Sequence, residues 1–508
     1  IVTRFSIQHF MGVLVLCVGI VLLGSLAYVS MPRENFPDVK VPVVTVTTVL
    51  DGANPADVEI ALTVPLETEL DSVEGLKEMR SVSSEDVSAI TLEFDPDVVI
   101  ETALGRVRDA VDKAKADLPS EADEPIVKEF SFSGDVPVMV LNLVAPDRVA
   151  LSELKDLADD IEDELKRIPG VLDAKIRGGR ERQVLVEVDP ERLRHYRLTL
   201  SQVQAVLTGT NRNVSAGVAE QAASRIVMRL PGEFRSPVEI FDLVIGASPQ
   251  GTPVHMRDVA LVRPSFEDET TRARLYDFTA ADGETPRGAY VEPRKSISIE
   301  IMKKSGENIL DVTQAVRGAV AKFPLPADVN VVTGLDLSKD VKMMLSDLEN
   351  GIGTSLLLVL LVIFVGMGAR NAVLVAFAIP FSMLISIVAL ALLDITLNIM
   401  VLYSLILALG MLVDNAIVIV ENIYRHFCMG ESRARAALNG TAEVAWPVIT
   451  STATTVGAFL PMIFWPGIMG EFMGFLPKTV IIVLTSSLFV ALVINPTLAA
   501  LFLKKPKG

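Results

Sequence analysis

The sequence contains six apolar stretches, each long enough to cross a lipid bilayer as a helix. A hydrocarbon layer of about 30 Å requires about 20 apolar residues at ~1.5 Å of rise per residue. We therefore expect a polytopic α-helical membrane protein with six spans. The stretches run over residues 10–31, 352–369, 371–393, 395–424, 444–468 and 479–503.

The first stretch could also be the apolar part of a cleaved signal peptide. Its apolar run is longer than the usual signal region, however, and no small-residue cleavage site precedes Pro32-Arg33-Glu34. This pattern favours an uncleaved anchor. Because the chain opens with Ile1 rather than Met, we expect that a short leader precedes it.

The charge of the chain is concentrated in one polar region. The 508 residues include 63 acidic and 46 basic side chains, which give a net charge of −17. Even so, 50% of all residues are hydrophobic. Residues 33–350 alone carry −20. The apolar content excludes a disordered chain, and the acidic balance without a basic cluster excludes a nucleic-acid binder. Cys17 and Cys428 lie in or beside apolar stretches, so the polar region has neither a disulfide nor a zinc site.

The basic residues indicate how the spans are oriented, because Lys and Arg collect in the short loops on the cytoplasmic side. If the six spans alternate, eight basic residues lie on one side and only Lys478 lies near a span end on the other. Both ends of the chain are then cytoplasmic, and residues 33–350 form a large outer domain. The eight are Arg4, Arg370, Arg425, Arg433, Arg435, Lys504, Lys505 and Lys507.

The outer domain alternates β-branched runs with amphipathic helices, in an order that occurs twice. Each pass reads β-α-β-β-α-β, which is the ferredoxin-like plan, and an α+β module over 179–274 interrupts the second pass. The first pass has strands at 43–49, 77–83, 88–94 and 126–132, with helices at 55–70 and 99–118. The second has strands at 137–144, 171–176, 296–302 and 329–334, with helices at 151–168 and 308–323.

One ionisable residue stands deep inside a span. Asp414 lies far into the fourth stretch between two apolar runs, and a carboxylate there costs at least about 2.5–3.5 kcal/mol. Such a group normally faces a bundle interior, a cation or a water path, so it suits a proton carrier, although a fixed ion pair between helices is an alternative. Asn415 could hold the carboxylate or bond across helices. Gly410 would permit close helix approach.

The remaining charges near span ends have a simpler explanation. Asp394 and Glu471 fit interfacial positions, and Glu421 and Arg425 fit an ion pair one turn apart.

The run Leu409-Gly-Met-Leu-Val-Asp-Asn-Ala-Ile-Val-Ile-Val-Glu-Asn-Ile423 closely resembles the fourth-helix signature of the resistance-nodulation-cell division (RND) superfamily of exporters. The resemblance covers essentially the whole chain and points to the N-terminal half of a hydrophobe/amphiphile efflux transporter of the acriflavin-resistance-like type. Further matches are Phe36-Pro37-Asp38, Asn54-Pro-Ala-Asp-Val-Glu59, Pro169-Gly-Val171, Pro461 and Asn495-Pro496.

The resemblance implies an inner-membrane homotrimer that works with a periplasmic adaptor and an outer-membrane channel. Inward proton movement would drive export of hydrophobic or amphiphilic compounds, with no cofactor beyond the proton motive force. The chain would divide into a cytoplasmic N-terminus with the first span (1–32), a first porter subdomain (33–134), a second porter subdomain (135–180 and 272–334), a docking subdomain (181–271), and a connector with spans two to six (335–508).

Two departures from the family pattern concern the relay. Many drug-exporting relatives carry two adjacent aspartates, whereas here Asp414 is followed by Asn415, so Asp414 keeps the role of proton acceptor and Asn415 has only a supporting one. The chain also ends after six spans, whereas relatives complete the relay in a second half. We expect either an N-terminal half or a transporter assembled from two polypeptides.

The substrate is less clearly indicated than the architecture. Phe130 and Phe132 could line a pocket for amphiphilic compounds, and core packing is the alternative. The scattered methionines of the outer domain form no relay for soft metal ions. Metal-ion efflux, and a lipid- or protein-translocating relative that does not pump, are the other candidates. The outer domain shows no enzymatic motif, so we expect no enzyme.

Overall fold

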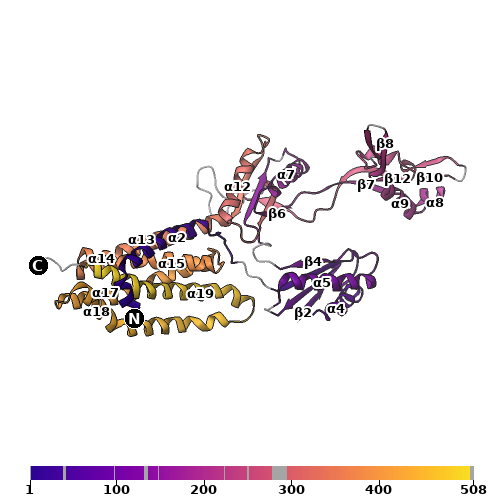
Figure 1. The fold of residues 1–508 in the computed structure, drawn as a ribbon. Coiled ribbons are helices and arrows are strands. Elements are labelled where there is room, and N and C mark those ends of the chain that lie inside the picture. The colour runs from indigo at the N-terminus through magenta and orange to yellow at the C-terminus, as the bar shows by residue number, and fades with distance from the viewer. Residues whose placement is uncertain are drawn as a thin grey trace.

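The computed structural model describes residues 2–37, 42–95, 98–130, 136–146, 148–221, 224–230, 232–248, 251–276 and 294–503. A helical bundle occupies one end of the molecule and three sheet-containing parts occupy the other (Figure 1). Within the described residues, six helical segments are long and apolar enough to cross a membrane, which confirms the expected number of spans. They are Phe10–Ser30, Leu337–Met367, Asn371–Leu392, Ile399–Cys428, Arg433–Phe464 and Met469–Phe502.

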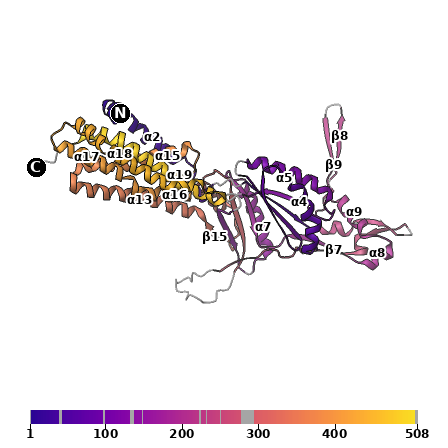
Figure 2. The ribbon, with the colours of Figure 1, turned by 90° about the horizontal axis from the view of Figure 1, so that it is seen from below.

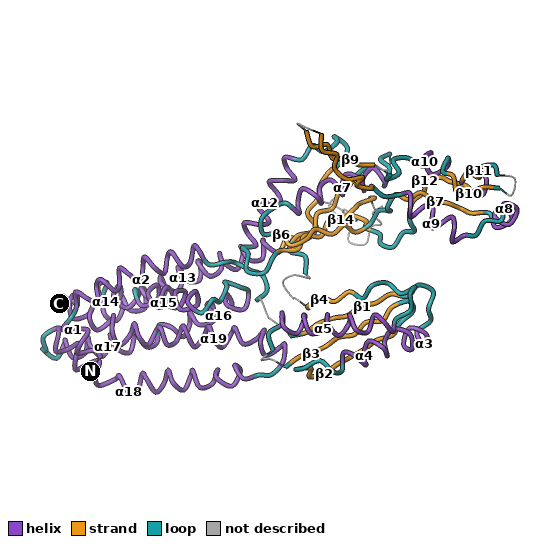
Figure 3. The backbone as a smooth tube through the Cα atoms, turned by 45° about the vertical axis from the view of Figure 1, so that its right-hand side comes forward, coloured by secondary structure: helices purple, strands orange, loops and turns teal. Residues whose placement is uncertain are grey.

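The bundle buries some spans and leaves others at its edge. The third, fourth and sixth spans are about half buried or more, whereas the second and fifth lie at the outside. α1 (Val2–Gln8) packs against α20 (Asn495–Phe502) at the end away from the sheets (Figure 3). The other elements are α2 (Phe10–Ser30), α13 (Leu337–Met367), α14 (Ala369–Ala376), α15 (Ala378–Leu392), α16 (Ile399–Leu412), α17 (Asp414–Cys428), α18 (Arg433–Phe459) and α19 (Gly467–Phe489).

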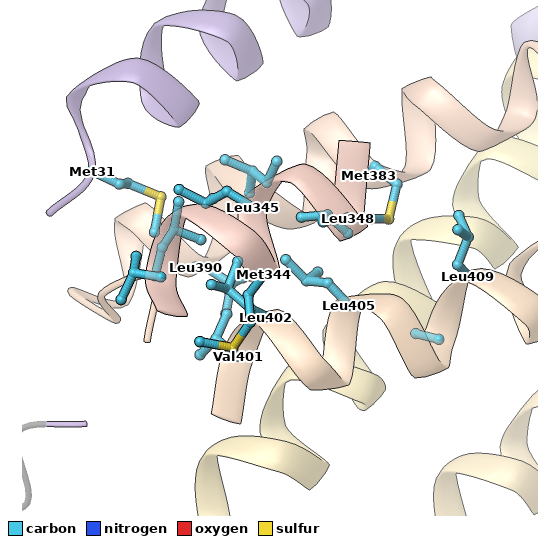
Figure 4. Close-up of a cluster of buried hydrophobic side chains, with 14 of the residues drawn as sticks. Met31, Met344, Leu345, Leu348, Met383, Leu390, Val401, Leu402, Leu405 and Leu409 are labelled. Carbon is cyan, nitrogen blue, oxygen red and sulfur yellow. The ribbon is translucent and has the colours of Figure 1, made fainter. Parts of the chain in front are cut away.

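The second span begins much earlier than its hydropathy indicates. α13 starts at Leu337 rather than at residue 352, and the side chain of Asp336 accepts a hydrogen bond from the backbone N–H of Ser338 at its first turn. Charged residues in this extension hide the helix from an apolar window, but Leu345 and Leu348 are buried at spacing typical of a helix. They lie in a cluster with residues of α15 and α16, among them Leu405 (Figure 4).

The first sheet follows the order β2-β3-β1-β4 with every neighbouring pair antiparallel. Val44, Val46 and Phe94 point to a core that α4 and α5 complete with Leu66 and Val107. The strands are β1 (Val43–Val49), β2 (Leu76–Ser83), β3 (Val87–Phe94) and β4 (Ile126–Glu129), and the helices are α3 (Pro55–Val58), α4 (Val64–Leu70) and α5 (Ile100–Ala114), with a π-helical turn over Glu59–Thr63. The order along the chain is strand, helix, strand, strand, helix, strand.

The second sheet repeats this arrangement with strands far apart in the chain. β14 (Arg294–Lys303) lies between β6 (Val171–Arg177) and β5 (Met139–Val144), and β5 also pairs with β15 (Asn330–Asp336). The short β13 (Ala273–Leu275) extends the edge at the start of β14. The helices of this part are α7 (Leu151–Lys166) and α12 (Ile309–Lys322).

A third part is inserted between β6 and β13 and extends away from the bundle (Figure 2). β7 and β12 lead out of the second sheet and back as an antiparallel pair, and Leu193, Val203 and Met256 belong to its separate core. Its elements are β7 (Arg182–Val188), α8 (Pro190–Tyr196), α9 (Leu200–Thr210), β8 (Val214–Gln221), β9 (Ser224–Leu230), α10 (Pro237–Phe241), β10 (Val244–Ala247), β11 (Pro253–His255), α11 (Met256–Val259) and β12 (Ala260–Phe266).

The close contact between α17 and α18 depends on a glycine. A Cβ at Gly440 would lie 2.8 Å from the Cα and 2.9 Å from the N of Ile423, backbone atoms that cannot move aside. We expect Gly440→Ala to lower the free energy of unfolding by about 1–3 kcal/mol, seen as a lower melting temperature in detergent. Gly457→Ala in the same helix meets nothing within 4 Å and should leave stability unchanged. An equal loss in both variants would contradict this packing.

Candidate functional site

The fourth span is interrupted next to Asp414, the carboxylate that stands within its apolar run. α16 ends at Leu412, and Asp414 stands in the first turn of α17. The carbonyl of Leu412 accepts a hydrogen bond from Ser487 Oγ of α19 at 2.6 Å, and helical bonding resumes between Ile417 N and Val413 O at 3.0 Å. In hydrocarbon a backbone carbonyl freed by such an interruption needs another donor. Ser487 therefore fixes the position of the break and, with it, the start of the helix that carries Asp414.

Asp414 lies on a face of the fourth span that is exposed in the described part of the chain. Exposed side chains recur along this face at helical spacing, so the carboxylate points away from the interior of the six-helix bundle. Of the three environments considered for Asp414, the six described spans do not provide the bundle interior. We call this face the open stripe; it comprises Tyr403, Leu407, Gly410, Asp414, Val418, Glu421 and Arg425.

Gly410 lies on the open stripe, one turn from the carboxylate. Among the described residues, nothing comes within 4 Å of a Cβ built at this position. The close helix approach that Gly410 would permit is therefore not made by the six described spans.

Asn415 points the opposite way from Asp414, into the bundle. Its side chain is 9% exposed, and Thr452 Oγ1 of α18 lies 3.2 Å from its Oδ1. The same hydroxyl lies 2.9 Å from the carbonyl of Val448, and because it carries one proton it serves one acceptor at a time. Of the two roles considered for Asn415, the structure places it in the bond between helices rather than beside the Asp414 carboxylate.

At the other end of α17, the charges pair across helices rather than along one. Arg425 contacts Glu443 of α18 at 2.7 Å, so the expected pair between Glu421 and Arg425 is wrong. His426 Nε2 lies 2.8 Å from the same carboxylate, and Asn422 donates to it at 3.1 Å. Sequence spacing favours partners on the same helix, and nothing in it reveals a contact with a residue one helix later.

The open stripe leads from Asp414 to a cavity at this end. The cavity has a volume of about 790 Å³, and its walls include Val418, Glu421 and Arg425 of the stripe. In the loop beside it, hydrogen bonds from His426 and then from Asn439 lower the pKa of the Glu431 carboxyl. The stripe thus joins Asp414 to this cavity through Val418, and the ionisable side chains of Glu421 and Arg425 lie at its far end.

The other predicted residues lie outside the bundle core. Asp394 and Glu471 line a cavity of about 700 Å³ on the side of the bundle that faces the sheets, as expected for interfacial charges. Phe130 lies at the end of β4 and is 37% exposed, so it does not belong to the core of the first sheet. Phe132 lies outside the described residues. In the described part of the chain, no group of three or more His, Cys, Asp or Glu is arranged to hold a metal ion.

The comparison with known families agrees with this arrangement. A model of the AcrB/AcrD/AcrF family matches residues 2–508. The chain belongs to this family. As an AcrB/AcrD/AcrF family member it is an RND-type transporter, and the family together with the six spans supports a multi-pass protein of the inner membrane.

In this protein, the hydrogen bond from Ser487 to the Leu412 carbonyl should contribute more to stability than a hydrogen bond that a serine makes within its own helix. We expect Ser487→Ala to lower the free energy of unfolding by about 1–3 kcal/mol, because it leaves a buried carbonyl unsatisfied. The matched control is Ser486→Ala, since Ser486 Oγ donates only to Ile482 of its own helix, at 2.8 Å. Thermal unfolding in detergent measures both, and equal melting temperatures would contradict the role of Ser487.

Proposed function

We propose that this chain is part of a proton-driven efflux transporter in which Asp414 takes up and releases the transported proton. The observation that carries the proposal is the carboxylate at the helix interruption, in the middle of a span and on its open stripe. A carboxylate in hydrocarbon is costly unless it is paired, hydrated or protonated. A change in its protonation therefore changes the packing energy of whatever covers the stripe.

The open stripe supports a second six-span bundle as that cover, from the same chain or a separate one. The stripe combines small, apolar and ionisable side chains along seven positions, which is unsuited to lipid. In this arrangement the second bundle provides the cation that pairs with the deprotonated Asp414. Gly410 then gives the close approach for which it has no partner among the described spans.

The outer region supports the proposed division into porter and docking subdomains. Its two sheets share the order that a duplicated ferredoxin-like unit requires, so we assign 33–134 and 135–180 with 272–334 to two porter subdomains. The inserted part, 181–271, has its own core and would be the docking subdomain. Members of the family generally act as trimers with a periplasmic adaptor and an outer-membrane channel. We propose the same assembly here, with both chain ends cytoplasmic and the sheets periplasmic.

The proposed substrates are hydrophobic or amphiphilic compounds. The acidic outer region, with a net charge of −20 over residues 33–350, favours the approach of cationic ones. Phe130, which is partly exposed at the end of its strand, remains a proposed pocket residue.

The substitution Asp414→Asn tests the proton role directly. It keeps the size of the side chain and removes its ability to titrate, so we expect efflux of a dye such as ethidium to fall to the background of cells that lack the transporter. The amount of protein in the membrane should not change. Asp347→Asn is the matched control, because Asp347 is an exposed carboxylate on the charged N-terminal extension of α13. Undiminished efflux by Asp414→Asn would instead favour a binding or translocating protein that needs no proton carrier.

Asn415→Asp tests whether the second acid of many relatives is needed. A carboxylate fits the same space and accepts the bond from Thr452 in place of the amide oxygen. We expect dye efflux within about threefold of the unsubstituted transporter, since one pairwise contact is retained. The measurement is ethidium efflux at equal protein levels, and complete inactivity would argue for a different coupling ion or path.

A further inference from the structure

The segment between the first span and the first sheet contains a fully buried carboxylate. The side chain of Glu34 is 1% exposed, and its partner Lys303, at the end of β14, is 3% exposed. Their charged atoms lie 2.8 Å apart although 269 positions separate them in the chain. Charges buried this completely require a partner and further hydrogen bonds.

The carboxylate of Glu34 joins three separate elements. Its Oε1 accepts from Lys303 Nζ and from the backbone N–H of Gly306 at 3.0 Å, in the turn between β14 and α12. Its Oε2 accepts from Thr396 Oγ1 at 3.0 Å, in the loop between α15 and α16. Gly306 has a φ of +76°, a conformation that favours glycine, so the turn is shaped to present this N–H.

Backbone hydrogen bonds hold the same three elements together. On the bundle side, Leu397 donates to Pro32, Glu34 donates to Leu397, and Ile399 at the start of α16 donates to Asn35. On the sheet side, Ile309 at the start of α12 donates to Arg33 at 2.9 Å. Asn398 caps α16 from this loop by accepting from Val401 N at 3.0 Å. The outer end of the helix that leads to Asp414 is thus bonded, through one short segment, to the second sheet.

The same sheet has a second attachment to the bundle. β15 ends at Asp336, which caps α13, and α13 runs without interruption from the sheet through the second span. Arg317 of α12 pairs with Asp336 at this point. β14 and β15 both flank β5, so the two attachments involve strands of the same sheet.

We propose that Glu34 is a coupling residue that makes the outer end of α16, the start of α12 and the end of β14 move as one body. Resting on the proton role of Asp414, this assigns to Glu34 the transfer of movement from the fourth span to the second sheet. Glu34 touches neither the proton carrier nor a substrate, so it acts by position. Breaking its bonds leaves Asp414 able to bind protons but removes the side-chain link between the start of the fourth span and the second sheet.

The readout for this role is the effect of substrate on Asp414, because coupling between two sites acts in both directions. A hydrophobic carbodiimide modifies protonated carboxyl groups in membranes, and its rate of reaction with Asp414 reports on that site. In the complete transporter we expect ethidium to change this rate. In Glu34→Gln we expect ethidium efflux to fall about tenfold or more, labelling of Asp414 to continue, and the effect of ethidium on labelling to disappear.

The matched control is Glu300→Gln on the same strand. Glu300 pairs with Arg177 at 3.0 Å, wholly within the second sheet, so this variant should keep both efflux and the effect of ethidium on labelling. If Glu34→Gln does not accumulate in the membrane, Thr396→Val removes only the link to the α15–α16 loop and should weaken the effect in the same direction.

Two outcomes overturn the coupling role. One is an unchanged ethidium effect in Glu34→Gln or Thr396→Val, and the other is an equal loss in Glu300→Gln. A different result would contradict both the proton role and the coupling. In that case Asp414 of the unsubstituted transporter does not react with the carbodiimide, or it reacts at a rate that neither pH nor ethidium changes.

Discussion

The cost of placing charge in hydrocarbon determines where each ionisable group of the bundle stands. Arg425, Glu443 and His426 form one connected group at one end of the fourth span, and Glu34 with Lys303 forms a buried pair at the other. Between them, Asp414 has no partner among the described residues at ion-pair distance. Two paired groups of charges thus flank an unpaired carboxylate in the described part of the chain.

The spans and the sheets could be predicted from the sequence because each depends on local periodicity. Apolar length defines a span, and alternating β-branched residues such as those of β1 define a strand with one buried face. The start of α13 could not be found this way. Its first turns are charged on one face and packed on the other. The mean hydropathy of this stretch is therefore low, although the spacing of its buried residues is that of a helix.

The site was only partly predictable, for a related reason. Asp414 stands out because any carboxylate in an apolar run demands a reason, but its direction depends on which neighbours cover each face of the helix. Hydropathy could not distinguish the face of Asp414 from that of Asn415, since flanking residues on both faces are apolar. Ser487, Thr452 and Glu34 depend on contacts between elements far apart in the chain, for which the only local signal is a polar residue in an apolar or buried setting.

The second sheet is attached to the bundle at two places. The second sheet continues covalently into α13 and is bonded through Glu34 to the start of α16, so it has two fixed points on two different spans. A rigid sheet held at two points responds to a relative shift of those spans by rotating, whereas a sheet held at one point is only carried along. Because α16 leads directly to the interruption at Asp414, the proposed coupling predicts that a small shift there rotates the second sheet, with Glu34 among the contacts that transmit it.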